Sequence, residues 1–74
     1  MAAPVLLYTK AGCSYCDAMR AALAARGAVV DEIDVGTRRE AIPELLKLTR
    51  GQRVVPVMVE GGRILIAPEG GSAF

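Results

Sequence analysis

Hydrophobic and polar positions in the first third of the chain predict a strand followed by a helix. Residues 5–8 form a short, nearly continuous apolar run, which is typical of a strand buried on both faces. Residues 14–26 instead repeat apolar positions at helical spacing, and Gly27 is placed to end that helix. The predicted inner face of the helix carries Cys16, Met19, Ala22 and Leu23.

The next strands are indicated by β-branched residues and glycines. Residues 28–35 are rich in β-branched residues and partly alternate, so they predict a second strand that Gly36 closes. Two further apolar runs, 54–60 and 63–66, are joined by the glycine pair 61–62. Because both glycines can take a positive φ, a tight antiparallel hairpin is predicted.

A second helix is predicted between residue 37 and Gly51. Residues 37–40, Thr-Arg-Arg-Glu, fit a capping box, and an apolar stripe follows them. Proline deep inside a helix costs ~3 kcal/mol. We therefore expect regular helix to begin near Arg39 or Glu40, which leaves Pro43 in or near the first turn. The stripe consists of Ala41, Ile42, Leu45 and Leu48.

The order of these elements is β-α-β-α-β-β, within a single domain spanning residues 1–74. A strand-helix-strand unit needs a right-handed crossover and pairs its strands in parallel, whereas the final hairpin is antiparallel. The prediction is an α/β fold with a four-stranded mixed sheet and two main helices, which need the sheet to cover their apolar faces.

Composition narrows the class of protein. Of the 74 residues, 53% are hydrophobic and 23% charged, and the net charge of +1 gives no strong field for nucleic acid. Residues 1–4 lack the features of a secretory signal, and no apolar run approaches the ~18 residues of a membrane span. We expect a monomeric, soluble cytoplasmic protein that binds neither nucleic acid nor membrane.

The two cysteines, Cys13 and Cys16, carry the strongest chemical signal. They flank Ser14 and Tyr15 where a helix should begin, and unpaired N–H groups there favour a thiolate. We expect Cys13 to be the nucleophile, with its sulfur presented to solvent and Lys10 as the nearby cation. Cys16 would then resolve the mixed disulfide. Ser14 could cap the helix or hydrogen-bond the sulfur, and capping is the favoured role.

A metal site is the main alternative use of this cysteine pair. Cys-x-x-Cys binds zinc in other proteins, but a closed zinc site needs about four ligands. The chain has two cysteines and no histidine, so we expect no resident metal. An iron–sulfur cluster shared between two chains stays open as an alternative.

The motif order resembles the thioredoxin fold in a minimal form, and the shortness of the chain resembles a glutaredoxin. The detailed likeness is to the small Uxx-star glutaredoxin-like group, whose members often carry selenocysteine where this chain has Cys13. That likeness rests on Asp-Val at 34–35, Leu-Lys-Leu-Thr at 46–49 and the run at 54–63. It covers residues 5–72. The family's third helix and its acidic pair after the glycines have no counterpart.

The resemblance implies a binding groove beside the cysteines. It implies that a cis peptide bond precedes Pro56, which faces the Cys13 sulfur, and that the Val55 backbone pairs with a thiol peptide such as glutathione. A trans proline at the start of an edge strand is the alternative. Tyr15 would cover the bound peptide, or be a solvated aromatic ring.

Three more residues are candidates for binding the peptide. Lys10 could bind a substrate carboxylate or be an ordinary surface lysine. Gly70 and Gly71 could form an anion-binding nest or belong to a frayed tail, and the tail is the favoured reading.

The function that these residues predict is thiol–disulfide exchange. The substrates would be disulfide-bonded or glutathionylated proteins, and the reductant would be glutathione or a thiol reductase. The alternative is an iron–sulfur cluster carrier or a redox-sensing module that uses the same two sulfurs.

Overall fold

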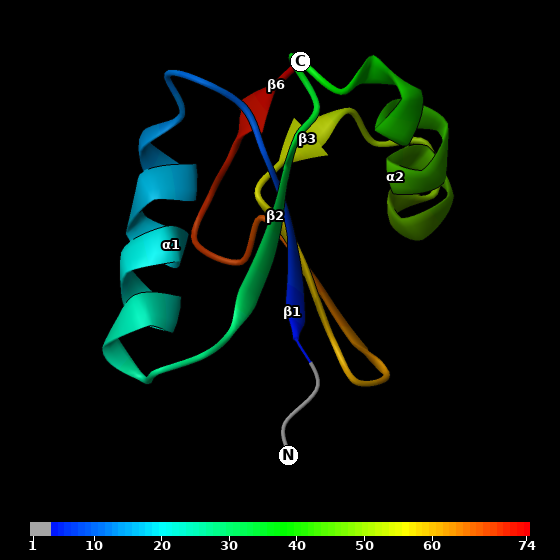
Figure 1. The fold of residues 1–74 in the computed structure, drawn as a ribbon. Helices are drawn as coiled ribbons and strands as arrows, with labels where there is room; N and C mark the ends of the chain where they lie inside the picture. Colours follow the sequence, from blue (N-terminus) through cyan, green and yellow to red (C-terminus); the bar gives the residue numbers. More distant parts are fainter. Residues whose placement is uncertain (1–3) are drawn as a thin grey trace.

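A central four-stranded sheet organises the computed structural model, which describes residues 4–74. The strands lie in the order β2-β1-β4-β5, with β1 parallel to β2, and β4 antiparallel to both β1 and β5. This mixed sheet confirms the predicted α/β fold of minimal thioredoxin-like topology (Figure 1). The strands are β1 (Val5–Thr9), β2 (Val30–Asp34), β4 (Val57–Glu60) and β5 (Arg63–Ile66).

The two helices, α1 (Ser14–Ala25) and α2 (Ile42–Thr49), cover opposite sides of this sheet (Figure 1). Strand β1 is buried on both faces, because its side chains alternate between the two layers. Leu7 packs in one cluster and Tyr8 in the other. The first cluster comprises Val5, Leu7, Leu23 and Met58. The second comprises Tyr8, Cys13, Cys16, Val35, Ala41, Leu45, Val55 and Val57.

Helix α2 begins differently from the prediction. A 3₁₀ turn, η1 (Arg39–Ala41), precedes it, and Pro43 lies in its first turn, as expected. The predicted capping box is wrong, because no side chain caps either element. The Thr37 hydroxyl instead donates to the Asp34 carbonyl at 3.2 Å, within the turn that follows β2.

The apolar run 54–60 is not one strand, because it divides at Pro56 into β3 (Val54–Val55) and β4. Strand β3 pairs with β6 (Ser72–Ala73) in a separate two-stranded sheet. The expected frayed tail is therefore wrong, because the chain after Gly71 is strand.

The predicted hairpin is present, with Glu60 opposite Arg63 across the turn. Of the glycine pair, only Gly61 has a positive φ, at 61°.

Candidate active site

The Cys13 sulfur caps helix α1. Cys13 has an extended backbone, with φ −99° and ψ 109°, and its Sγ accepts the backbone N–H of Cys16 at 3.2 Å. The expectation that Ser14 caps the helix is wrong, because Ser14 is its first helical residue. The cap position thus belongs to the sulfur, which satisfies one of the donors that every helix start leaves unpaired.

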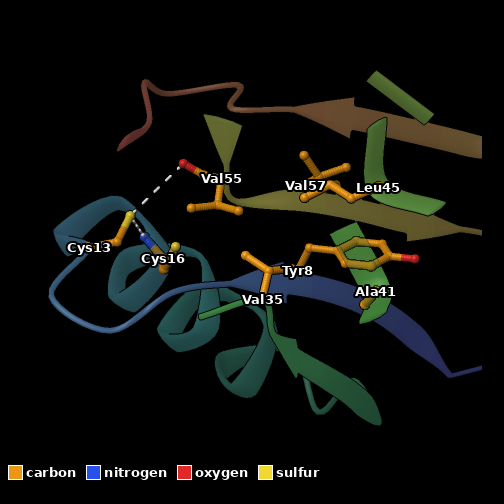
Figure 2. Close-up of a cluster of buried hydrophobic side chains, with 8 residues drawn as sticks. All are labelled: Tyr8, Cys13, Cys16, Val35, Ala41, Leu45, Val55 and Val57. Atoms are coloured by element: carbon orange, nitrogen blue, oxygen red, sulfur yellow. Dashed lines mark hydrogen bonds between the residues drawn. The ribbon is translucent and has the colours of Figure 1, made fainter. Parts of the chain in front are cut away.

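Cys13 is buried, with 1% of its surface exposed, so the expectation of a solvent-presented sulfur is wrong. Its Sγ lies 3.9 Å from the carbonyl oxygen of Val55, a weak contact that links the helix start to β3 (Figure 2). Cys16 is also buried, at 0% exposure, and neither sulfur forms a disulfide. The site is a dithiol enclosed by its own chain.

The environment of Cys13 lowers the pKa of its thiol. Burial has the largest single influence on this pKa and raises it. Hydrogen bonds from the Cys16 thiol and the Ser72 hydroxyl, and from the backbone N–H groups of Cys16 and Tyr15, act in the other direction and together prevail. Because hydrogen bonds favour the charged form, Cys13 is the more nucleophilic of the two sulfurs.

The environment of Cys16 raises the pKa of its thiol to about 12. Burial is the main cause, and the hydrogen bond with Cys13 adds to it. Cys16 therefore stays protonated near neutral pH and donates to Cys13. The two sulfurs, one helical turn apart, have opposite shifts, which separates a nucleophile from a proton-bearing partner.

Pro56 lies directly after Val55, and the peptide bond between them is cis, as the resemblance implied. A pocket of about 170 Å³ opens beside Pro56, between α1 and the segment before β6. Tyr15 is 43% exposed and lines this pocket with Pro56 and Gly70. A Cβ at Gly70 would lie 2.8 Å from the Tyr15 ring, so glycine lets the ring pack there.

Sequence comparison now identifies the family. The model of the glutaredoxin family matches residues 5–65, which include both cysteines and Pro56. The chain belongs to the glutaredoxin family. Neither the search of curated proteins nor the search of solved structures finds a match. Membership makes thiol–disulfide exchange the functional class of this domain, while the likeness to the Uxx-star group stays a prediction.

Lys10 of this glutaredoxin points to the C-terminal strand. Its Nζ donates to the Ala73 carbonyl at 2.7 Å. Hydrogen bonds, and not the Lys10 charge, lower the pKa of Cys13. On α1, Asp17 pairs with Arg20 at 2.6 Å, and Arg20 also binds Glu32 of β2 at 2.7 Å. These ion pairs connect the first turns of α1 to β2.

A second pocket, of about 140 Å³, lies on the Lys10 side of the site. Three cationic side chains, Lys10, Arg39 and Arg53, line it together with the Phe74 ring. Arg53 lies 4.7 Å from the centre of that ring and donates to the Phe74 carbonyl at 2.8 Å. The pocket therefore combines positive charge with an aromatic wall.

Sequence analysis missed Ser72. It pairs with Val55 in the β3–β6 ladder, and its hydroxyl is one of the groups that lower the pKa of the Cys13 thiol. The only sequence signal was its place directly after Gly70 and Gly71. The structure thus gathers Cys13, Cys16, Tyr15 and the segments 55–56 and 70–72 at one end of the domain, with Lys10 beside them.

Two absences hold for the residues that the structure describes. Between residues 4 and 74, no group of three or more Cys, His, Asp or Glu side chains is arranged to hold a metal ion. Over that same span, no helix has the length and apolar character needed to cross a membrane.

Proposed function

We propose that this glutaredoxin reduces glutathione mixed disulfides and protein disulfides, with Cys13 attacking and Cys16 resolving. The observation that carries the proposal is the opposite character of the two sulfurs. Cys13 caps α1 with a lowered thiol pKa, while the pKa of Cys16 is about 12. A thiolate attacks disulfides much faster than a thiol does, which assigns the first step to Cys13.

In the first step the Cys13 thiolate attacks one sulfur of the substrate disulfide. A new bond forms between Sγ and that sulfur, the old S–S bond breaks, and the other sulfur leaves as a thiolate that takes up a proton. The negative charge therefore leaves Cys13. That loss removes two of the influences that raise the pKa of Cys16, its hydrogen bond to Cys13 and the charge of Cys13.

In the second step Cys16 loses its proton and attacks the Cys13 sulfur. The Cys13–Cys16 disulfide forms, and the captured thiol leaves and is protonated. Two electrons have then passed from the enzyme's dithiol to the substrate. Two molecules of a thiol such as glutathione return these electrons and become one disulfide.

The basic pocket supports glutathione as the co-substrate. Glutathione is a small thiol peptide with two carboxylates, and Lys10, Arg39 and Arg53 line a pocket of suitable charge. We place the enzyme in a reducing compartment, the cytoplasm, where free thiols persist.

Two serine variants test the proposal with a glutathionylated peptide as substrate. We expect Cys13→Ser to abolish glutathione-dependent release of the peptide, because the attacking sulfur is gone. Cys16→Ser should keep part of the activity, because a second glutathione can attack the Cys13 mixed disulfide directly. Equal loss of activity in both variants would contradict the assignment of Cys13 as the attacking residue and Cys16 as the resolving residue. Visible absorbance bands from a cluster in anaerobically purified protein would favour the carrier alternative.

A further inference from the structure

Strand β6 occupies the backbone edge beside the reactive sulfur. Val55 is opposite Ser72, and two positions along the ladder the Phe74 N–H donates to the Arg53 carbonyl at 3.2 Å. In an antiparallel ladder, residues two apart point their N–H and C=O groups to the same side. The Val55 backbone groups therefore face Ser72. This is the edge at which an extended peptide would add as a strand.

Two cationic side chains hold β6 in this position. Lys10 donates to the Ala73 carbonyl at 2.7 Å, and Arg53 donates to the Phe74 carbonyl at 2.8 Å while lying over the Phe74 ring. Both hydrogen bonds are exposed to water, so each contributes modestly to stability. A strand of two residues held in this way belongs to the least stable part of a fold, and a competing strand can displace it.

Ser72 lies where the reacting group of such a competing peptide would have to be. It is opposite Val55, whose carbonyl oxygen is 3.9 Å from the Cys13 Sγ, and its hydroxyl is one of the groups that lower the pKa of the Cys13 thiol. Serine and cysteine differ only in the oxygen or sulfur at the γ position. A cysteine at this register would bring its sulfur to Cys13, which is the contact that disulfide exchange requires.

We propose that β6 is an internal pseudosubstrate strand, with Ser72 in the place of the substrate cysteine, and that an extended peptide binds by displacing it. The proposal rests on the proposed function and names its substrate class. The substrate runs antiparallel to β3 with its cysteine opposite Val55. Lys10 and Arg53 then bind the carbonyls of the next two residues. An aromatic residue two positions after the cysteine packs on Arg53, as Phe74 does.

Cross-linking tests the register without any turnover. In a Cys16→Ser background, Ser72→Cys should form a disulfide with Cys13 when oxidised dithiothreitol is added. The two thiols lose two protons and two electrons, which the oxidant accepts as it becomes a dithiol. Ala73→Cys is the matched control, because its side chain is exposed and alternates to the other face of the strand. Mass spectrometry and thiol counting should show the bridge only in the Ser72→Cys protein. An equal yield in the control, or no bridge at residue 72, would overturn the proposal.

A glycine variant tests displacement. A Cβ at Gly71 would lie 2.5 Å from the Val55 carbonyl oxygen, so Gly71→Ala should push β6 off β3. We expect iodoacetamide to alkylate Cys13 several-fold faster in this variant. Gly62→Ala is the control, because a Cβ there meets nothing within 4 Å. Circular dichroism checks that both variants fold. An unchanged rate in a folded Gly71→Ala protein contradicts the proposal.

A comparison of two peptides with opposite chain direction tests the binding mode of the substrate separately from the proposed function. Peptides containing Cys-Ala-Phe and Phe-Ala-Cys, each as a glutathione mixed disulfide, should differ in KM, with the first lower. Equal KM values would remove the assigned direction. If neither peptide is reduced while the Ser72→Cys bridge still forms, the proposed function fails and the position of β6 stands.

Discussion

The two helices of this domain begin in different ways, and only one beginning is reactive. Helix α1 starts at a sulfur that accepts a backbone N–H, whereas α2 follows a 3₁₀ turn and has no side-chain cap. Both helices have one acidic residue in the first turn, Asp17 and Glu44, so the charge near the dipole does not distinguish them. The two helix starts differ in the group that accepts hydrogen bonds from the unpaired backbone N–H groups. At α1 that group is Cys13, and the same hydrogen bonds that start the helix favour its thiolate.

Proline serves α2 in place of a cap. Pro43 has no N–H to satisfy, and its fixed φ suits the first helical turn. Residue Ala41, which precedes the helix, already has helical backbone angles of φ −82° and ψ −13°. The start of α2 therefore has fewer N–H groups that need a side-chain acceptor, and it forms without a reactive residue at the cap position.

The largest effect that separates the two sulfurs at the α1 start should appear in their alkylation rates. We expect Cys13 in the Cys16→Ser variant to react with iodoacetamide at pH 7 more than about tenfold faster than Cys16 in the Cys13→Ser variant, since one pKa unit changes the thiolate fraction about tenfold. Both residues are almost fully buried, at 1% and 0% exposure, so burial is matched.

The pH dependence of these rates gives the sign of each shift. The Cys13 rate should rise with pH and level off at a lower pH than that of free cysteine, because its pKa is lowered. The Cys16 rate should still be rising at strongly alkaline pH. A Cys13 plateau at or above that of free cysteine would contradict the proposed role of the cap.

A smaller effect should measure the cap itself. Cys13→Ser replaces the sulfur with an oxygen that can still accept the Cys16 N–H, whereas Cys13→Ala removes the acceptor. We expect the alanine variant to have a free energy of unfolding about 1 kcal/mol lower than the serine variant, the usual worth of an N-cap. Urea unfolding under reducing conditions measures this difference. Equal stabilities would show that the α1 start, like that of α2, needs no cap.

The smallest effect should occur at α2. Pro43→Ala should lower the free energy of unfolding by about 0.5 kcal/mol, because alanine gives the unfolded chain more conformations to lose. The same urea experiment measures it. A change as large as that between the two Cys13 variants would erase the contrast between the helix starts.

Periodicity predicted the elements that contribute to the core. The strand at residues 5–8, the helix ended by Gly27 and the hairpin at 61–62 are all present, because apolar spacing reports which side chains must be buried. The capping box failed because the Thr37 hydroxyl binds the Asp34 carbonyl 3.2 Å away. A local motif has several possible partners, and the turn after β2 offered a nearer one.

Strand β6 could not be predicted in this way. Ser72 and Ala73 have neither apolar alternation nor β-branched side chains, and their partners in β3 lie far away in sequence. The burial of Cys13 was missed in part for the same reason, since its sulfur contacts the carbonyl of Val55, the residue that Ser72 pairs with. The positions of Cys13, Cys16 and Pro56 were available from motif and family likeness, but the enclosure of the site depends on a long-range pairing.

Because the side chains of β1 alternate between the two faces of the sheet, this small domain has two separate buried clusters. Both sulfurs pack in the cluster with Tyr8 and Leu45, and the cluster with Leu7 and Leu23 contains neither, although α1 contributes Cys16 to the first and Leu23 to the second. Because Leu23 and Cys16 lie on the same helix, a substitution that repacks the Leu23 cluster and shifts α1 also moves the sulfurs. Substitutions in the cluster with Tyr8 and Leu45 change the packing around the sulfurs directly, so a designer should treat those side chains as part of the catalyst.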